Sequence, residues 1–331
     1  MEKIAATGLI IGKFMPPHLG HRYLVDFARR CVERLTVLVG SLSSEPIPGA
    51  LRLAWMQEMF PGVTVLHHTA ENPQYPEEHP AFWDIWRDSI RALVPTGPDI
   101  VFASEDYGVT LAEVLGARFM PVDRERALVP VSATAIRQDP LAHWAYLPSC
   151  VRPHFVKRVC VYGPESTGKS TLTRDLAAHF GTVYVAEYGR TLLDANGGRC
   201  TADDIDMIAH GHRASEEAMA RQANRVLFSD TDTITTVLWS EILVGDCPAW
   251  IRELAERRRH DLHLLLDVDV PWVADPQRFL PDDRAAQFTR WRAELDRRGL
   301  PYVVIRGSWD ERFATARQAV ERLLRGNGAS G

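Results

Sequence analysis

The chain has 331 residues, more than one hydrophobic core usually organises, so we expect two domains. Apolar residues make up 46% and charged residues 24% of it, as in ordinary globular proteins, and no apolar run approaches the roughly 18 residues of a membrane span. The net charge of −5 argues against a main task of binding nucleic acid, and five scattered cysteines without a CxxC pair favour a reducing, cytoplasmic setting over disulfides or structural zinc.

Short apolar runs alternate with amphipathic stretches through the first half of the chain. Residues 6–12 and 35–40 predict buried parallel strands, and residues 20–33 between them have the spacing of a helix. The same alternation continues to about residue 117. It predicts a doubly wound α/β domain with a parallel sheet.

The second half predicts another domain of the same class. Prolines interrupt the pattern between residues 139 and 155, so we expect one domain over 1–152 and a second over 153–326. An amphipathic helix is predicted over 203–224. The expected strands of the second domain lie within apolar runs at 156–163, 182–189, 225–232, 261–269 and 302–307.

The stretch "GKFMPPHLGH" follows the first predicted strand. Gly12 ends that strand where the chain turns, and two prolines stiffen the loop that contains Phe14. His18 and His21 are three residues apart at the start of a helix, which places both rings on one face with Lys13 nearby. Imidazoles and an ammonium group at a helix N-terminus can hold a triphosphate and stabilise charge during its displacement. We therefore predict an ATP site here.

The stretch "VSATAIR" completes this predicted site. Ser132 has the position of a helix N-cap, with a hydroxyl that can meet an anion. Thr134 and Arg137 are three apart on the first turn, so the guanidinium group can close over the same phosphates.

The stretch "GPESTGKST" fits the phosphate-binding pattern G-x-x-x-x-G-K-[ST], between a predicted strand and a predicted helix. Lys169 can reach the β- and γ-phosphates of ATP, and the Ser170 hydroxyl can ligate Mg²⁺. The residues predicted to bind this second ATP are Gly163, Glu165, Ser166, Thr167, Gly168, Ser170 and Thr171.

A phosphate-binding loop needs a carboxylate at another strand end to hold the metal. "RVLFSDTDT" offers Asp230 as the Mg²⁺ partner, with Asp232 beside it. The competing pair is Asp267 and Asp269 in "LLLDVDVP". Either pair could instead cap a helix or solvate a strand end.

Glu187 and a proline-rich insert indicate a kinase for a small molecule. Glu187 falls at a strand end, where a carboxylate can deprotonate an attacking hydroxyl; the alternative is a salt-bridged surface glutamate. Arg278 and Arg284 lie in an insert expected to act as a lid, where they could neutralise phosphoryl charge. The motifs of protein kinases do not occur.

These motifs together resemble one known family. "GKFMPPHLGH" and "VSATAIR" are similar to the GxFxPxHxGH and SxTxxR motifs of nucleotidylyltransferases. "GPESTGKST", "EYGR", "DTD" and "PWVAD" follow in the order of the NadR-type family, which fuses a nicotinamide mononucleotide adenylyltransferase to a ribosylnicotinamide kinase. The resemblance implies a Rossmann-like nucleotidylyltransferase followed by a P-loop kinase, with Mg²⁺ as cofactor and ATP as co-substrate.

The resemblance also implies one reaction for each half. In the second half, the 5′-hydroxyl of nicotinamide riboside attacks the γ-phosphate of ATP. In the first half, the phosphate of nicotinamide mononucleotide attacks the α-phosphate of ATP, which gives NAD and pyrophosphate. Lys13, His18, His21 and Arg137 would stabilise the charge of this displacement.

Trp83 and Trp86 in "FWDIWRDS" would stack on the nicotinamide ring if they match the helix tryptophans of the family. The alternative is that they pack in the core. Some members begin with a helix-turn-helix domain, but the first motif here opens at residue 12, so we expect no DNA binding by this chain. The lid also departs from the family, which more often has a glycine after "VAD".

Two other functions remain open from the sequence. The same frame could act on another nucleoside or vitamin phosphate, or the chain could be a nucleotide-sensing regulator without turnover. Lys169, Ser170 and the acid pair favour an enzyme, because a sensor need not keep metal-handling groups. Whether the chain forms a homo-oligomer is equally open.

Overall fold

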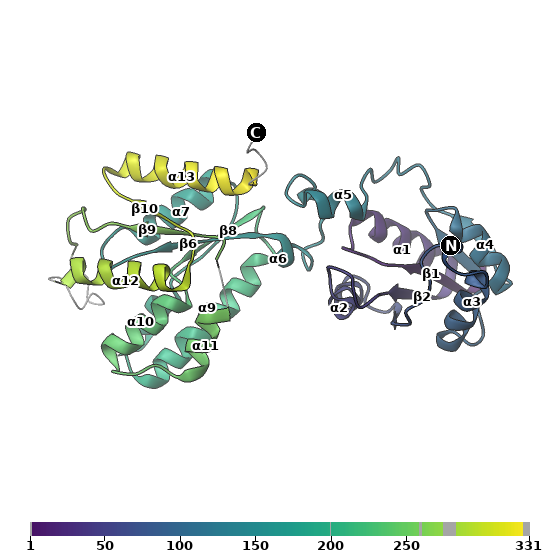
Figure 1. The fold of residues 1–331 in the computed structure, drawn as a ribbon, viewed down its shortest axis with the longest axis horizontal. Coiled ribbons are helices and arrows are strands. Elements are labelled where there is room, and N and C mark those ends of the chain that lie inside the picture. Colours follow the sequence, from purple (N-terminus) through teal and green to yellow (C-terminus); the bar gives the residue numbers. More distant parts are fainter. Residues whose placement is uncertain (1, 199, 258–259, 274–282, 327–331) are drawn as a thin grey trace. The chain divides into compact units, whose positions relative to one another are not determined.

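The computed structural model describes residues 2–198, 200–257, 260–273 and 283–326 (Figure 1). The chain divides into two compact units, Met1–Val151 and Arg152–Gly331. Within the described residues, no helix is both long enough and apolar enough to span a membrane.

The first unit is a five-stranded parallel sheet in the order β3-β2-β1-β4-β5, with helices on both faces (Figure 1). Neighbouring residues of β1 point to opposite faces: Ile10 packs with residues of α1 and α2, and Leu9 packs with residues of α3 and α4. The elements are β1 (Ala5–Gly12), α1 (Leu19–Cys31), β2 (Val32–Gly40), α2 (Gly49–Met59), β3 (Thr64–His68), α3 (Phe82–Leu93), β4 (Ile100–Ala103), α4 (Tyr107–Leu115), β5 (Arg118–Pro121) and α5 (Ala133–Gln138), with short 3₁₀ turns at Pro76–Glu78 and Trp144–Tyr146.

The second unit is also a five-stranded parallel sheet, in the order β10-β9-β6-β8-β7. Val159 and Val161 of β6 pack with α7 and α13, whereas Cys160 and Tyr162 pack with α9 to α12. The elements are α6 (Arg152–Phe155), β6 (Lys157–Tyr162), α7 (Lys169–His179), β7 (Tyr184–Val185), α8 (Tyr188–Ala195), α9 (Ala202–Ala220), β8 (Val226–Asp230), α10 (Thr233–Leu243), α11 (Ala249–Arg257), β9 (Leu262–Leu266), α12 (Arg284–Arg298), β10 (Tyr302–Ile305) and α13 (Trp309–Arg325).

The parallel register brings the loops of each unit to one edge of its sheet. In the first unit, Gly12 of β1 pairs with Val39, and Gly40 of β2 pairs with His68. Loops that follow these strands therefore lie at the same carboxyl edge, where open α/β sheets bind ligands.

The predicted fold class, two doubly wound α/β sheets, is confirmed. Two details differ from the sequence patterns. The strand expected within 182–189 is only Tyr184–Val185, because α8 begins at Tyr188. The edge strand Arg118–Pro121, with mixed burial and a proline, was not predicted from the apolar pattern.

Candidate functional site

The loop between β1 and α1 brings His18 and His21 together. His18 is the N-cap of α1 and accepts a hydrogen bond from the Gly20 amide at Nδ1 (3.1 Å), while His21 Nδ1 accepts from the His18 amide (3.2 Å). The ring centroids are 3.8 Å apart. This reciprocal capping fixes both rings at the start of the helix.

Both imidazoles are neutral at physiological pH. Burial, together with the positive charge of Arg126, lowers the pKa of His18 to about 4. Burial and the neighbouring His18 hold the pKa of His21 well below its ordinary value. Because each Nδ1 accepts a backbone hydrogen, the proton of each neutral ring is assigned to Nε2, which is a donor suited to phosphate oxygens.

Gly12 and Phe14 shape the same loop. Phe14 is buried, adopts a left-handed backbone (φ 47°) and meets the His21 ring edge-on, with ring centroids 4.9 Å apart. A Cβ at Gly12 would lie 3.2 Å from the Phe14 ring. Glycine at position 12 therefore lets the aromatic ring support the histidine.

Lys13, the predicted phosphate ligand, pairs with a carboxylate that the motif analysis did not single out. Its ammonium lies 2.9 Å from Glu45 Oε1, and the Lys13 side chain remains 48% exposed. Burial alone would raise the pKa of Glu45, but hydrogen bonds from Lys13 and the Leu42 amide hold it below its ordinary value. The pair thus holds an ionised carboxylate beside the loop.

The stretch "VSATAIR" forms α5 and contacts this loop. Ser132 caps α5 and accepts from the Ala135 amide at 3.1 Å. Arg137 donates to the Met15 carbonyl at 2.5 Å and to the Thr134 hydroxyl at 3.1 Å. The structure therefore brings Arg137 to the loop that carries the histidines.

Trp83 and Trp86 on α3 are half-buried and pack against the apolar cluster of that sheet face. Trp86 donates to the Pro73 carbonyl at 2.9 Å and stacks on His68, with 5.1 Å between ring centroids. Trp83 meets Phe82 edge-on. Both rings thus have packing partners, and nicotinamide stacking by them stays a prediction.

In the second unit, the loop from Gly163 to Gly168 joins β6 to α7. Gly163 (φ 142°) and Gly168 (φ 88°) have backbone conformations that disfavour other residues. A Cβ at Gly163 would lie 2.9 Å from the Leu266 carbonyl oxygen, and one at Gly168 would lie 2.5 Å from the Trp309 ring. The loop packs tightly enough that only glycine fits at both positions.

Lys169 and Thr167 also hold this loop. Lys169 Nζ donates to the Pro164 carbonyl at 2.8 Å, and the buried Thr167 hydroxyl donates to the same carbonyl at 2.9 Å. The remaining predicted loop residues line the pocket beside the loop: Glu165, Ser166, Ser170 and Thr171.

Asp230 at the end of β8 lies beside this loop. It is 3% exposed, and burial followed by the negative charge of Glu187 raises its pKa to about 6, against the lowering effects of Lys169 and a hydrogen bond from the Ser170 hydroxyl. Asp230 Oδ1 is buried without a hydrogen-bond partner. A carboxylate oxygen without a partner beside a serine hydroxyl fits a Mg²⁺ ligand set.

Asp232 caps the helix that follows β8. Its Oδ1 accepts from the amide of Thr235 at 2.9 Å, so it caps α10, and its Oδ2 lies 3.1 Å from His263 Nε2. Asp232 thus makes the helix-cap contact that the sequence left open as the alternative, and a metal role for Asp232 stays a prediction. The competing carboxylates face arginines: Asp267 lies 3.7 Å from Arg306, and Asp269 is paired with Arg312.

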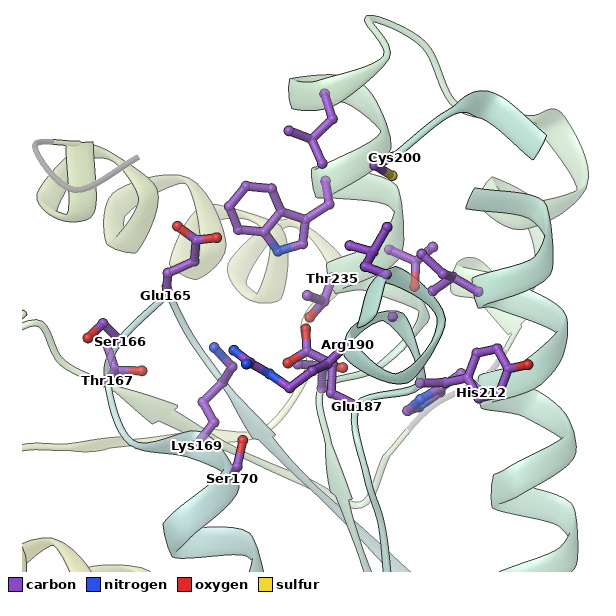
Figure 2. Close-up of a pocket in the computed structure, with 18 of the residues that line it drawn as sticks. Glu165, Ser166, Thr167, Lys169, Ser170, Glu187, Arg190, Cys200, His212 and Thr235 are labelled. Atoms are coloured by element: carbon purple, nitrogen blue, oxygen red, sulfur yellow. The ribbon is translucent and has the colours of Figure 1, made fainter. Parts of the chain in front are cut away.

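Figure 2 shows the pocket that joins this loop to α8, α9 and α10. Glu187 is at the N-cap position of α8 without capping through its side chain, and it lines the pocket. Together with Lys169 and Arg190, it lies close enough to act electrostatically on Asp230. Glu187, the predicted base, thus lies near Lys169 and Asp230, which were predicted to handle phosphate and metal.

Several pocket residues were not predicted from the sequence. Arg190 could have been predicted, because it lies three residues after Glu187 in the quoted "EYGR" motif. His212 on α9 and Thr235 and Trp239 on α10 come from helices whose apolar spacing indicates packing rather than binding.

Arg284 of the predicted lid contacts the phosphate loop from outside the pocket. It donates to the Val270 carbonyl at 3.0 Å and to the Ser166 carbonyl at 3.4 Å, and lies over the Trp272 ring. The Ser166 hydroxyl accepts from the Val273 amide at 2.8 Å. Arg278 lies outside the described residues.

Comparisons with known proteins agree with this architecture. An AAA domain family matches residues 158–312. Two crystal structures of NadR protein share the fold of the chain: one in complex with NAD and AMP-PNP (TM-score 0.78) and one in complex with NR (TM-score 0.79), each 22% identical and covering 97% of both chains.

Curated relatives are closer in sequence. The "Trifunctional NAD biosynthesis/regulator protein NadR" of Escherichia coli is 32% identical over an alignment of 343 positions, which covers 96% of this chain and 83% of the relative. The protein of the same name from Salmonella typhimurium is 32% identical over an alignment of 341 positions, with the same coverage. At this identity along nearly the whole sequence, the chain belongs to the NadR family.

Proposed function

We propose that the chain is a bifunctional enzyme of NAD biosynthesis and salvage. The second unit would phosphorylate nicotinamide riboside, and the first would transfer the adenylyl group of ATP to the resulting nicotinamide mononucleotide. The observation that carries the proposal is that each unit has its own loop between the carboxyl end of a central strand, β1 or β6, and a helix N-terminus, a geometry suited to binding an anion. The ligands in the NadR crystal structures, NAD, AMP-PNP and NR, support the choice of substrates.

In the kinase reaction, the 5′-hydroxyl oxygen of the riboside forms a bond to the γ-phosphorus of ATP while the bond to the β-γ bridging oxygen breaks. Glu187 accepts the hydroxyl proton, and ADP leaves. Lys169 and the loop amides hold the phosphates, and Arg190 faces the same pocket. Ser170 and Asp230 would hold Mg²⁺, which neutralises phosphate charge when bound.

The pocket wall suits a pyridine nucleoside. Trp239 offers an aromatic face, and Leu193, Ile208 and Leu243 line the same cavity, whereas the phosphate side of the pocket is polar. An indole can stack on a cationic pyridinium ring, a contact worth about 0.5–2 kcal/mol. The apolar residues therefore line the end of the pocket proposed for the riboside, and the polar residues line the end proposed for the phosphates of ATP.

In the adenylyl transfer, a phosphate oxygen of the mononucleotide forms a bond to the α-phosphorus of ATP, and pyrophosphate leaves. The reaction needs no protein nucleophile and no general base, since the attacking phosphate is already ionised. Neutral His18 and His21 donate hydrogen bonds from Nε2 as charge builds on the phosphate oxygens, and Lys13 and Arg137 supply positive charge.

Two single substitutions in the full chain test the assignment of the two sites. With Mg-ATP, Lys169→Ala should lower mononucleotide formation from the riboside by about a hundredfold or more, because it removes the ammonium group that donates hydrogen bonds to the transferring phosphoryl group. NAD formation from added mononucleotide should be unchanged. His21→Ala should do the reverse. Chromatography of the nucleotide products measures both steps in one reaction.

Thermal unfolding of each variant checks that the substituted unit is still folded, because the retained reaction reports only on the other unit. If Lys169→Ala abolished NAD formation from the mononucleotide, the two-site assignment would be wrong. Wild-type protein that binds ATP but forms neither product would instead support a nucleotide sensor. Turnover of another nucleoside in place of the riboside would change the substrate and retain the mechanism.

A further inference from the structure

Two arginines are among the largest fully buried side chains of the described residues: Arg52 in the first unit is 0% exposed, and Arg312 in the second is 1% exposed. A buried guanidinium group is costly unless every donor has a partner. The partners of these two side chains therefore show what each arginine holds together.

Arg52 is the fourth residue of α2 and connects three backbone segments. Its Nη1 donates to the Lys13 carbonyl at 2.6 Å and to the Gly40 carbonyl at 3.0 Å, and its Nε donates to the Ile47 carbonyl at 3.0 Å. Its Nη2 pairs with Glu45, the carboxylate that also pairs with Lys13. Lys13 begins the loop after β1, and Gly40 ends the adjacent strand β2.

Arg312 is the fourth residue of α13 and has the same kinds of partner. Its Nη1 donates to the Thr167 carbonyl in the loop from Gly163 to Gly168 at 3.0 Å, and its Nη2 donates to the carbonyl of Asp267, the residue directly after β9, also at 3.0 Å. Its Nε donates to the Gly307 carbonyl at 3.1 Å, and its carboxylate partner is Asp269. The adjacent strand is β9, the neighbour of β6.

The two units thus use one arrangement. In each, a buried arginine joins the loop after the central strand to the carboxyl end of the neighbouring strand. We call these two loops, 13–18 in the first unit and 163–168 in the second, the phosphate loops. In each unit, Nε bonds to the carbonyl five residues earlier, and a carboxylate balances the charge. A lysine could not make all the contacts of this guanidinium group, because one ammonium group cannot reach several carbonyls in fixed directions.

We propose that Arg52 and Arg312 are positioning residues, each for the phosphate loop of its own unit. They contact no substrate; they fix the backbone that carries Lys13 and His18 in the first unit, and Thr167 and Lys169 in the second. Catalytic donors must be held to within a fraction of an ångström, so a loosened loop weakens ATP binding and slows transfer. This inference rests on the proposed pair of reactions.

Four full-chain variants test the proposal: Arg52→Met, Arg312→Met, the conservative Arg52→Lys, and Arg298→Met as a matched control. Arg298 is also a buried arginine, with a side chain 6% exposed, but it pairs with Glu294 and Glu256, outside both phosphate loops. For each variant, KM for ATP and kcat are measured separately for mononucleotide formation and for NAD formation, with thermal unfolding alongside.

We expect Arg52→Met to raise KM for ATP about tenfold in NAD formation, as loss of hydrogen bonds from a charged donor allows, and to leave it within about twofold in the kinase reaction. Arg312→Met should show the opposite pattern. Arg52→Lys should give an intermediate effect on NAD formation. Arg298→Met should change neither KM, whatever it does to the unfolding temperature.

A merely structural role makes a different prediction. Partial unfolding lowers the active fraction and hence the apparent kcat, but leaves KM for ATP unchanged. Suppose that the wild-type chain has both activities. The proposal would then be overturned if Arg52→Met left KM for ATP unchanged in NAD formation and Arg312→Met left it unchanged in mononucleotide formation. If Arg52→Met does not fold, Arg52→Lys decides by the same criterion. Wild-type protein lacking both activities would contradict the proposed function instead.

Discussion

His18 is 6% exposed, and burial with the charge of Arg126 lowers its pKa to about 4 in the folded protein. In an unfolded chain its pKa would be near 6.5. The folded state therefore disfavours the protonated ring. The preference of the fold for the neutral His18 ring contributes fully to the free energy of unfolding above pH 6.5. This contribution is lost as the pH falls toward 4.

The substitution His18→Asn should remove this pH dependence, since asparagine also caps helices but does not titrate. Between pH 8 and pH 4.5, the wild-type first unit should lose roughly 2–3 kcal/mol more unfolding free energy than the variant. Amide hydrogen exchange of peptides from β1 and α1 measures the loss in that unit alone. Equal losses in both proteins would show that His18 titrates normally.

Motifs identified the residues that act through local spacing, such as His18 with His21. They did not identify the partners that hold those residues. Arg52 lies 39 residues from the Lys13 carbonyl it binds, and Arg312 lies 145 residues from Thr167. Such contacts depend on how strands are ordered in the sheet, which local spacing does not specify.

At the scale of elements, α9 shows the same limit. The sequence pattern over 203–224 predicts an amphipathic helix, yet two polar residues of α9 face inward: His212 is 4% exposed and Glu216 is 3% exposed. Glu216 Oε1 lies 3.8 Å from His212 Nε2 and 3.2 Å from His260 Nε2. His260 and His263 in turn lie near Asp232, the cap of α10. This buried cluster connects α9, α10 and β9.

Glu216 stabilises the protonated form of both neighbouring histidines. Burial lowers the pKa of His212 and opposes the rise at His260, while the charge of Glu216 raises the pKa of each. The contribution of a raised pKa is largest at low pH and disappears as the pH rises through the folded value. Loss of the Glu216 charge should therefore cost more at low pH than at high pH.

We expect Glu216→Gln to destabilise the second unit by about 3 kcal/mol near pH 5.5, as for breaking a buried charge pair, and by clearly less near pH 8. Urea denaturation at both pH values, with hydrogen exchange of α9 peptides, measures the difference. The adjacent Glu217→Gln is the matched control, because the Glu217 side chain is 53% exposed. A cost that is the same at both pH values would contradict the role of histidine charge.

At the scale of the whole molecule, the alternation of apolar runs was sufficient to predict two doubly wound sheets. Buried parallel strands need continuous apolar runs, so the pattern carries their order along the chain. It does not specify the partners of buried polar groups: the "DTD" pattern allowed a metal ligand or a helix cap at Asp232, and the fold shows the helix-cap contact. The site residues that could be predicted are those whose chemistry depends on loop and helix ends.

The described residues of each phosphate loop, with the arginine that holds it, come from a single unit. Each unit also has its own sheet and apolar clusters, so each should fold as a separate fragment. We expect fragment 1–151 to form NAD from the mononucleotide, and fragment 152–331 to phosphorylate the riboside, each with a KM for ATP within about twofold of the full chain. An equimolar mixture should then convert the riboside to NAD. Soluble fragments that are inactive apart but active together would mean that one unit supplies a necessary group to the other.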